Sequence, residues 1–104
     1  MKVKLFDSIS DAFDVLNEQE PRLVKSGNKN ICIVRLNNKL IAFLNECPHQ
    51  GESLHRGVVN YLGEIVCPLH AYRFNLMTGA SHNNRCRDLT LIRVTVTDAV
   101  YLEV

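Results

Sequence analysis

Two short segments determine how this chain is interpreted: Cys47-Pro48-His49 and, after a spacer of seventeen residues, Cys67-Pro68-Leu69-His70. Each segment pairs one cysteine with one histidine. Thiolates and imidazoles are donors for iron and zinc, and two such pairs on separate loops can enclose a metal centre that neither loop could hold alone. The sequence therefore predicts a metal centre built from these two segments.

The order of the donors separates two kinds of metal site. Zinc sites with two Cys and two His usually have a Cys pair followed by a His pair. Here the order is Cys, His, Cys, His, which suits a binuclear cluster in which one iron takes both thiolates and the other takes both imidazoles. A zinc-stabilised binding module without redox function stays open as an alternative.

Residues 45–88 surround these segments and differ in composition from the rest of the chain. They contain four of the five glycines, two of the three prolines and all four histidines. Loops rich in turn residues on a strand framework are where proteins commonly place function. Gly51 follows the first Cys-His pair, where a tight loop needs a backbone conformation that other residues avoid. We expect residues 45–88 to form the cluster-binding part.

The flanking sequence predicts a β framework. Residues 31–36 and 40–44 are β-rich and separated by Asn-Asn-Lys, whose asparagines tolerate the positive φ of a tight hairpin turn. Residues 89–96 and 99–104 form a second expected hairpin, and residues 3–6 an opening strand.

A short helix is permitted directly after the opening strand. Ile9, Phe13 and Leu16 follow helical spacing behind a possible cap at Ser8 or Ser10.

Length and charge narrow the class of protein. A chain of 104 residues with 46% hydrophobic residues suggests one domain, residues 1–104, around one core. Twelve basic and eleven acidic residues argue against a nucleic-acid partner. The sequence has no apolar run of membrane-spanning length and no apolar stretch after Met1-Lys2 like that of a secretory signal, so we expect no membrane partner and a cytoplasmic location.

Other residues with reactive or charged groups are expected to have no role in the centre. Cys32 alternates with Val34 and Leu36 in an apolar run and is expected to be a core thiol. Cys86 lies in a polar loop and is expected to be a half-buried structural cysteine. His55 and His82 lack a nearby paired Cys and are expected to be surface imidazoles. The arginines that flank or follow the cluster loops are expected to be simply solvated, with a role in docking as the alternative: Arg56, Arg73, Arg85 and Arg87.

Beyond the four donors, the sequence resembles the Rieske ferredoxin family. Cys47-Pro48-His49-Gln50-Gly51-Glu52-Ser53-Leu54 is similar to the family's first cluster loop. The second loop is similar to Cys67-Pro68-Leu69-His70-Ala71-Tyr72-Arg73-Phe74-Asn75 with Thr78-Gly79. The resemblance covers nearly the whole chain. It implies an all-β fold of Rieske-like antiparallel sheets arranged as a sandwich, with a two-loop cluster-binding subdomain.

The resemblance also implies a cofactor and a function. One [2Fe-2S] cluster would be held by Cys47 and Cys67 on an inner iron and by His49 and His70 on an outer iron near the surface. The expected function is a ferredoxin, not an enzyme, that carries single electrons between a reductase and an acceptor such as an oxygenase. A small Rieske subunit of a nitrite-reductase-like enzyme is the other redox interpretation.

Five positions depart from the family or from its high-potential members. Ala71 replaces a common glycine. Glu52 and Leu69 stand where high-potential relatives carry two disulfide-bonded cysteines, and Tyr72 and Phe74 stand where those relatives place a Ser and a Tyr hydroxyl against the sulfurs. Donated hydrogen bonds raise the potential of such clusters. We therefore expect a reduction potential at the low end of the Rieske range.

Overall fold

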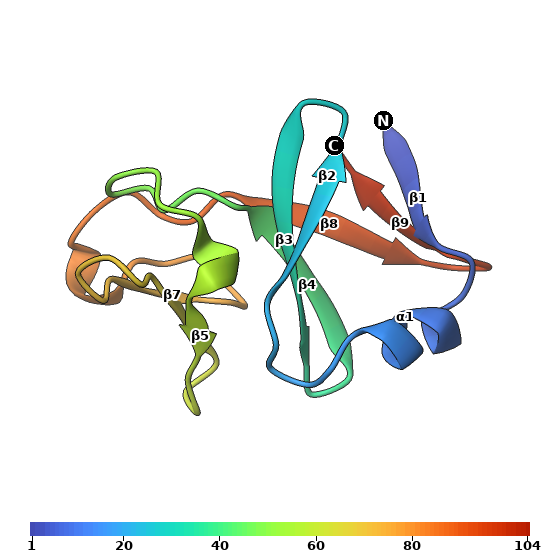
Figure 1. Ribbon diagram of the computed structural model, residues 1–104, viewed down its shortest axis with the longest axis horizontal. Helices are drawn as coiled ribbons and strands as arrows, with labels where there is room; N and C mark the ends of the chain where they lie inside the picture. Colours follow the sequence, from blue (N-terminus) through green and yellow to red (C-terminus); the bar gives the residue numbers. More distant parts are fainter.

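Two antiparallel sheets form the fold in the computed structural model, which describes residues 1–104 (Figure 1). The strands of the larger sheet are β1 (Lys2–Phe6), β2 (Arg22–Ser26), β3 (Lys29–Leu36), β4 (Lys39–Leu44), β8 (Leu91–Val96) and β9 (Val100–Glu103). Their spatial order is β1-β9-β8-β4-β3-β2. The smaller sheet contains β5 (Val58–Val59), β6 (Glu64–Val66) and β7 (Arg73–Asn75), in that order. The predicted all-β class with antiparallel sheets is confirmed.

Both predicted hairpins are present in the larger sheet. Leu36 pairs with Lys39, so the turn consists of Asn37 and Asn38, whose φ angles of 51° and 61° are those of a tight primed turn. The second hairpin joins β8 to β9. Its first strand begins two residues later than predicted, because the amide of Leu89 donates to the Gly79 carbonyl in the neighbouring loop.

The predicted helix is α1 (Ile9–Val15). The Ser8 hydroxyl accepts a hydrogen bond from the Asp11 amide at 3.0 Å, which satisfies one of the unpaired amides of the first turn. Ala12 packs on the larger sheet against Ile33 and Val100. Two short 3-10 helices, η1 (Leu54–Arg56) and η2 (His82–Asn84), complete the fold. None of these helices has the length and apolar character needed to cross a membrane.

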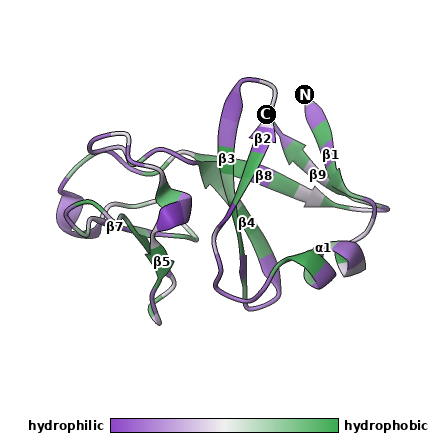
Figure 2. Ribbon diagram, in the orientation of Figure 1, coloured by the Kyte–Doolittle hydropathy of each residue, from purple (hydrophilic) through white to green (hydrophobic).

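A single group of buried residues connects the two sheets. Phe43 of the larger sheet, Ile65 and Phe74 of the smaller sheet, and the loop cysteines Cys47 and Cys67 all belong to it. The strands that border this core, β4 among them, are coloured as hydrophobic in Figure 2. The candidate metal ligands therefore begin at the hydrophobic core.

Cys32 belongs to the same core group and is fully buried. Burial raises the pKa of its thiol to about 12, since a thiolate is poorly solvated there. The prediction that Cys32 is a core thiol is confirmed.

The sequence did not predict β2 or the smaller sheet. β5, β6 and β7 have only two or three residues each, too few for the alternation that identifies a strand. β2 is largely exposed and pairs only with β3, so it also lacks a strong apolar pattern.

Gly57 determines how closely the first loop approaches the smaller sheet. A Cβ atom at this position would lie 2.0 Å from the carbonyl oxygen of Val66, the last residue before Cys67. Only glycine permits another backbone to come this near. The hydrogen bond from the Gly57 amide to the Leu54 carbonyl, at 2.9 Å, fixes the same turn.

We therefore expect Gly57→Ala to separate the two loops. The added methyl group meets backbone atoms, which cannot move aside as a side chain can, so the free energy of unfolding should fall by about 2–3 kcal/mol or more. Thermal unfolding and the iron content of purified protein measure both effects. Gly27→Ala is the control for iron content: its φ of 60° makes alanine cost about 1–2 kcal/mol of stability, but a Cβ there meets nothing within 4 Å, so the cluster loops should stay together. Equal iron content in Gly57→Ala and wild-type protein would contradict the proposed role of this contact.

Candidate metal centre

The two Cys-His segments form loops that close in the same way. The amide of Cys47 donates to the carbonyl of Glu52, and the amide of Cys67 donates to the carbonyl of Tyr72, each at 2.8 Å. The first loop leads from β4 to η1, and the second joins β6 to β7. Each loop thus turns back on the residue that carries its thiol, and the two thiols come from different sheets.

Left-handed backbone conformations make these tight turns possible. Gly51 has a φ of 74°, and its amide donates to the Cys47 carbonyl at 2.7 Å, which confirms the role predicted for this glycine. In the second loop His70 and Ala71 have φ angles of 67° and 53°. Each such residue other than glycine costs about 1–2 kcal/mol, so the second loop holds its conformation against local strain.

The two loop thiols lie side by side in a dry environment. Cys47 and Cys67 are 2% and 1% exposed, and neither forms a disulfide. Burial raises the pKa of the Cys67 thiol, and its hydrogen bond and charge interaction with the Cys47 thiol raise the pKa further. The amide of Leu69 donates to the Cys67 sulfur, and this hydrogen bond lowers the pKa of the thiol. A bound cation would favour the thiolate form of both.

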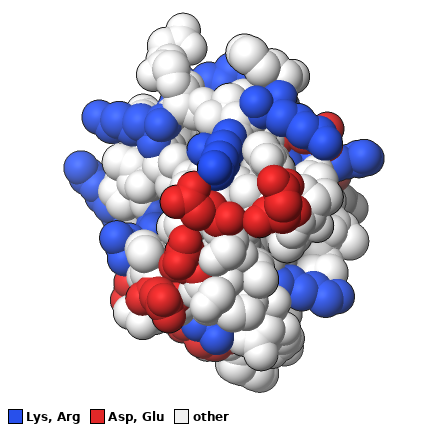
Figure 3. Space-filling model, turned by 90° about the vertical axis from the view of Figure 1, so that its right-hand side faces the viewer, with Lys and Arg blue, Asp and Glu red and all other residues white.

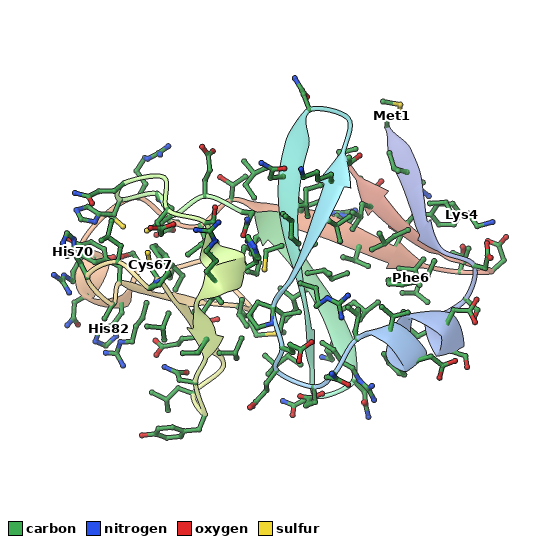
Figure 4. The ribbon with its side chains drawn as sticks, viewed as in Figure 1. Met1, Lys4, Phe6, Cys67, His70 and His82 are labelled. Atoms are coloured by element: carbon green, nitrogen blue, oxygen red, sulfur yellow. The ribbon has the colours of Figure 1, made fainter.

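The two loop imidazoles also lie together, nearer the surface. The ring centroids of His49 and His70 are 5.7 Å apart. His70 is exposed and His49 is half-buried. Figure 4 shows His70 at the end of the molecule farthest from Met1 and Lys4, with Cys67 farther inside. The centre therefore has a thiol side in the core and an imidazole side toward solvent.

One atom of this site has an unsatisfied bonding requirement. Nδ1 of His49 is the only buried side-chain nitrogen or oxygen in the chain without a hydrogen-bond partner. Leaving such an atom unpaired costs about 1–3 kcal/mol, and a metal ion bound to Nδ1 would remove the cost. The donor types and this orphaned nitrogen fit an iron-sulfur cluster.

The ligands do not converge on one point. No three His, Cys, Asp or Glu side chains of the chain gather closely enough to hold a single metal ion. A structural zinc ion needs four donors around one centre. A thiol pair and an imidazole pair at separate depths instead match a centre with two metal positions.

Comparison with known proteins identifies the family. The sequence model of the family described as "Rieske [2Fe-2S] domain" matches residues 9–94. The chain belongs to the Rieske family. The cofactor that this membership implies is one [2Fe-2S] cluster.

Known Rieske proteins similar to this chain include both small and large ones. The anthranilate 1,2-dioxygenase ferredoxin subunit of Burkholderia cepacia is 33% identical over 79 residues, which are 76% of this chain and 69% of that protein. The carnitine monooxygenase oxygenase subunit of Escherichia coli (strain K12) is 36% identical over 62 residues, or 59% of this chain, and the match spans 17% of that protein's length.

The fold is also similar to that of a solved Rieske ferredoxin. The ferredoxin of carbazole 1,9a-dioxygenase from Nocardioides aromaticivorans IC177 superposes with a TM-score of 0.81 and 27% sequence identity. The match covers 98% of this chain and 95% of that protein.

His55 braces the first Rieske loop, so the expectation that it is a solvated surface residue was wrong. Buried Asn45 precedes the loop, and its side-chain oxygen accepts a hydrogen bond from the His55 amide at 2.7 Å. Nδ2 of Asn45 lies 2.8 Å from Nδ1 of His55. The residue before the loop is thus joined to η1 after it. The sequence signal for this brace was a polar Asn directly after an apolar strand.

Three of the four arginines expected to be solvated have specific contacts. Arg73 lies 3.4 Å from the Glu64 carboxylate, the guanidinium of Arg85 lies 4.1 Å from the centroid of the Tyr72 ring, and Arg87 donates to the Pro48 carbonyl at 3.5 Å. Arg56 is exposed and makes no ion pair. Arg85 and Arg87 are exposed, as expected, although the loop at 80–88 brings them onto the cluster loops. The expectation was wrong for Arg73, which is half-buried on β7 beside Glu64.

The remaining two side chains lie at the edge of this region. His82 is exposed, with Nδ1 3.9 Å from Glu64. Cys86 is half-buried, as expected, and its sulfur lies 3.7 Å from the Ser81 hydroxyl.

The strained second loop should tolerate glycine better than its native residue. Ala71→Gly removes a Cβ from a left-handed position and is expected to raise the stability by about 0.5–1 kcal/mol, equivalent to a rise of roughly 2–8 °C in Tm. Differential scanning calorimetry of the holoprotein measures this rise. Ala80→Gly is the matched control, since Ala80 is exposed without a positive φ and should lower Tm. A fall in both variants would contradict the strain assigned to Ala71.

Proposed function

We propose that this protein is a Rieske ferredoxin that carries single electrons between redox proteins. In this proposal Cys47 and Cys67 bind the inner iron, and His49 and His70 bind the outer iron. The cluster, when bound, supplies reversible one-electron chemistry. The observation that carries the assignment is the unpaired, buried Nδ1 of His49 beside a second imidazole and above a pair of buried thiols.

The residues around the cluster would perform two tasks. The core side, with Cys47 and Cys67 almost fully buried, excludes water from the thiolate ligands. The surface side exposes His70, so an electron has a short path to a docked protein. No nucleophile paired with a base was found in the sequence, which supports a carrier rather than an enzyme.

The names of two similar proteins support the class of partner. One is a ferredoxin subunit of anthranilate 1,2-dioxygenase and the other a ferredoxin of carbazole 1,9a-dioxygenase. We infer that this chain receives electrons from a reductase and passes them to an oxygenase or a similar acceptor. We further propose that residues 1–104 act as one domain, with residues 45–88 as its cluster-binding part, in the cytoplasm, where the thiols of Cys32 and Cys86 are expected to stay reduced.

The small subunit of a nitrite-reductase-like enzyme is the alternative among redox proteins. It would use the same cluster but stay bound to one large protein. Affinity purification of the tagged chain from its natural host distinguishes the two: a free monomer that a flavoprotein reductase can reduce supports the ferredoxin, and stable co-purification with one large subunit supports the alternative.

Cluster content tests the ligand assignment directly. Cys47→Ser and Cys67→Ser should each lose most of the iron and acid-labile sulfide, because the buried thiolates are the inner ligands, and the domain should also loosen without its metal. Cys32→Ala and Cys86→Ala should keep the red-brown colour and the paramagnetic signal of the reduced protein. A colourless wild-type protein with stoichiometric zinc and no sulfide would establish the zinc-binding alternative instead.

The reduction potential should lie toward the low end of the Rieske range of about −150 to +300 mV. Phe74 is fully buried in the core group of the two thiols and has no hydrogen to donate, and the Tyr72 ring stacks on His49 at 4.0 Å between centroids. Phe74→Tyr supplies a hydroxyl where high-potential relatives have one and should raise the potential. Protein-film voltammetry measures both proteins. A wild-type potential well above zero would refute this assignment.

A further inference from the structure

Two arginines of the loop at 80–88 lie on the cluster loops, one on each. The Arg85 guanidinium carbon lies 4.1 Å from the centroid of the Tyr72 ring in the second loop. Arg87 donates to the carbonyl of Pro48 in the first loop at 3.5 Å. Both side chains are exposed, so their charges face solvent beside the histidine side of the centre.

Neither of these two charges is neutralised by an ion pair. The six ion pairs of the chain include Arg22, Arg35, Arg73 and Arg93 but neither Arg85 nor Arg87. Glu46 and Asp88 line a hollow of about 270 Å³ together with Arg87, so they moderate the field of Arg87. Arg85 does not line this hollow and makes no ion pair.

Arg85 is held in place by an aromatic stack. The rings of His49 and Tyr72 are parallel within 4°, with centroids 4.0 Å apart. Because His49 occupies one face of the Tyr72 ring, the Arg85 guanidinium must cover the other face. A guanidinium fixed on an aromatic ring loses little conformational freedom when a partner binds. The stack therefore presents a preorganised positive charge next to an outer-iron ligand.

The opposite end of the molecule carries acidic groups. Asp7 and Asp11 line a hollow with Lys4, and Asp98 acts on Lys4 electrostatically. Figure 3, which shows the right-hand side of Figure 1, displays Asp and Glu side chains across the middle of that face with Lys and Arg side chains around them. Outside residues 45–88 the chain has eight Lys and Arg and seven Asp and Glu, so this end has mixed charge. The orientation of a docked protein therefore depends on the local charges of Arg85 and Arg87.

We infer that Arg85, Arg87 and the exposed edge of His70 form the docking surface for an electron-transfer partner, and that the partner presents an acidic surface there. The two arginines attract the acidic patch, and because they lie beside the cluster loops the encounter would bring His70 toward the partner. This inference rests on the proposed electron-carrier function. The transfer would balance as one electron lost by the bound cluster and one electron gained by the acceptor.

Two small oxidants of opposite charge test the sign of this surface. The reduced holoprotein is mixed in a stopped-flow instrument with ferricyanide, an anion, or with tris(phenanthroline)cobalt(III), a cation, at low and high ionic strength. Each oxidant removes one electron. In the variant R85Q/R87Q we expect ferricyanide to react about threefold to tenfold more slowly at low salt and the cobalt complex to react faster. Both differences should shrink at about 0.5 M salt, where charges are screened within a few ångströms.

Matched variants separate surface charge from other effects. Lys25→Gln removes one charge from β2, outside the cluster loops, where Lys25 is exposed and makes no ion pair; it should change either rate much less than R85Q/R87Q does. R85K keeps the charge but weakens the stack, and should keep the ferricyanide rate. A changed cluster potential would raise or lower the reaction rates of both oxidants together. A changed surface charge would raise the rate of one oxidant and lower the rate of the other.

Three results would overturn the docking surface. These are equal changes with both oxidants, no change in R85Q/R87Q at low salt, or an equally large effect of Lys25→Gln. Failure of the proposed function is distinguishable, because it would appear earlier as a wild-type protein without the spectrum of an iron-sulfur cluster.

Discussion

The rest of the structure depends on two buried thiols that must lie side by side although they come from different sheets. Cys47 follows a strand of the larger sheet, and Cys67 follows a strand of the smaller one. Both belong to the core that also contains Phe43, Ile65 and Phe74. The cysteine pair is therefore part of the packing surface, and in the proposed function it would bind the inner iron as well. This is why the close approach of Gly57 to Val66 matters: it brings the backbone of the first loop against the strand that leads into the second.

From this buried pair the site becomes more polar and more open toward the surface. The two imidazoles are not equivalent, since Tyr72 stacks on His49 while His70 remains exposed. A ring that covers one histidine limits the contact of solvent with that side of the centre. Of the two loop imidazoles, only that of His70 is exposed to an approaching protein. An electron carrier needs one shielded side and one exposed side. If every histidine lay deep in the core, the electron would have a longer path to the partner, and if the cluster were fully open to solvent, it would be lost more easily.

The sequence predicted those features that have a local physical signature. Asn37 and Asn38 indicated a tight turn because asparagine tolerates positive φ, and the paired Cys and His indicated a metal centre because few other functions need that combination. The smaller sheet was missed because its strands are too short to show a periodic pattern. The contacts of His55, Arg85 and Arg87 were missed for a different reason: each joins residues that only the folded loops bring together, ten or more positions apart. Ala71 lies between these two cases. The sequence showed that it replaces a common glycine, but only the structure showed that its backbone is left-handed and that the alanine is therefore strained.

Separate sets of residues should govern the potential of the cluster and the recognition of its partner. Arg85 lies near a ligand and favours the reduced state, which carries one more negative charge, but its guanidinium is exposed and its field is screened by water and salt. Hydrogen bonds to the ligand sulfurs act inside the core, where the effective dielectric constant is lower and each interaction is stronger. The absence of a donor at buried Phe74 should therefore outweigh the presence of a cation at exposed Arg85. The exposed charge of Arg85 should act mainly on an approaching partner, because it attracts opposite charges on that partner before the two proteins touch. A Rieske protein built in this way can change its partner through the loop at 80–88 while its potential stays under the control of the core.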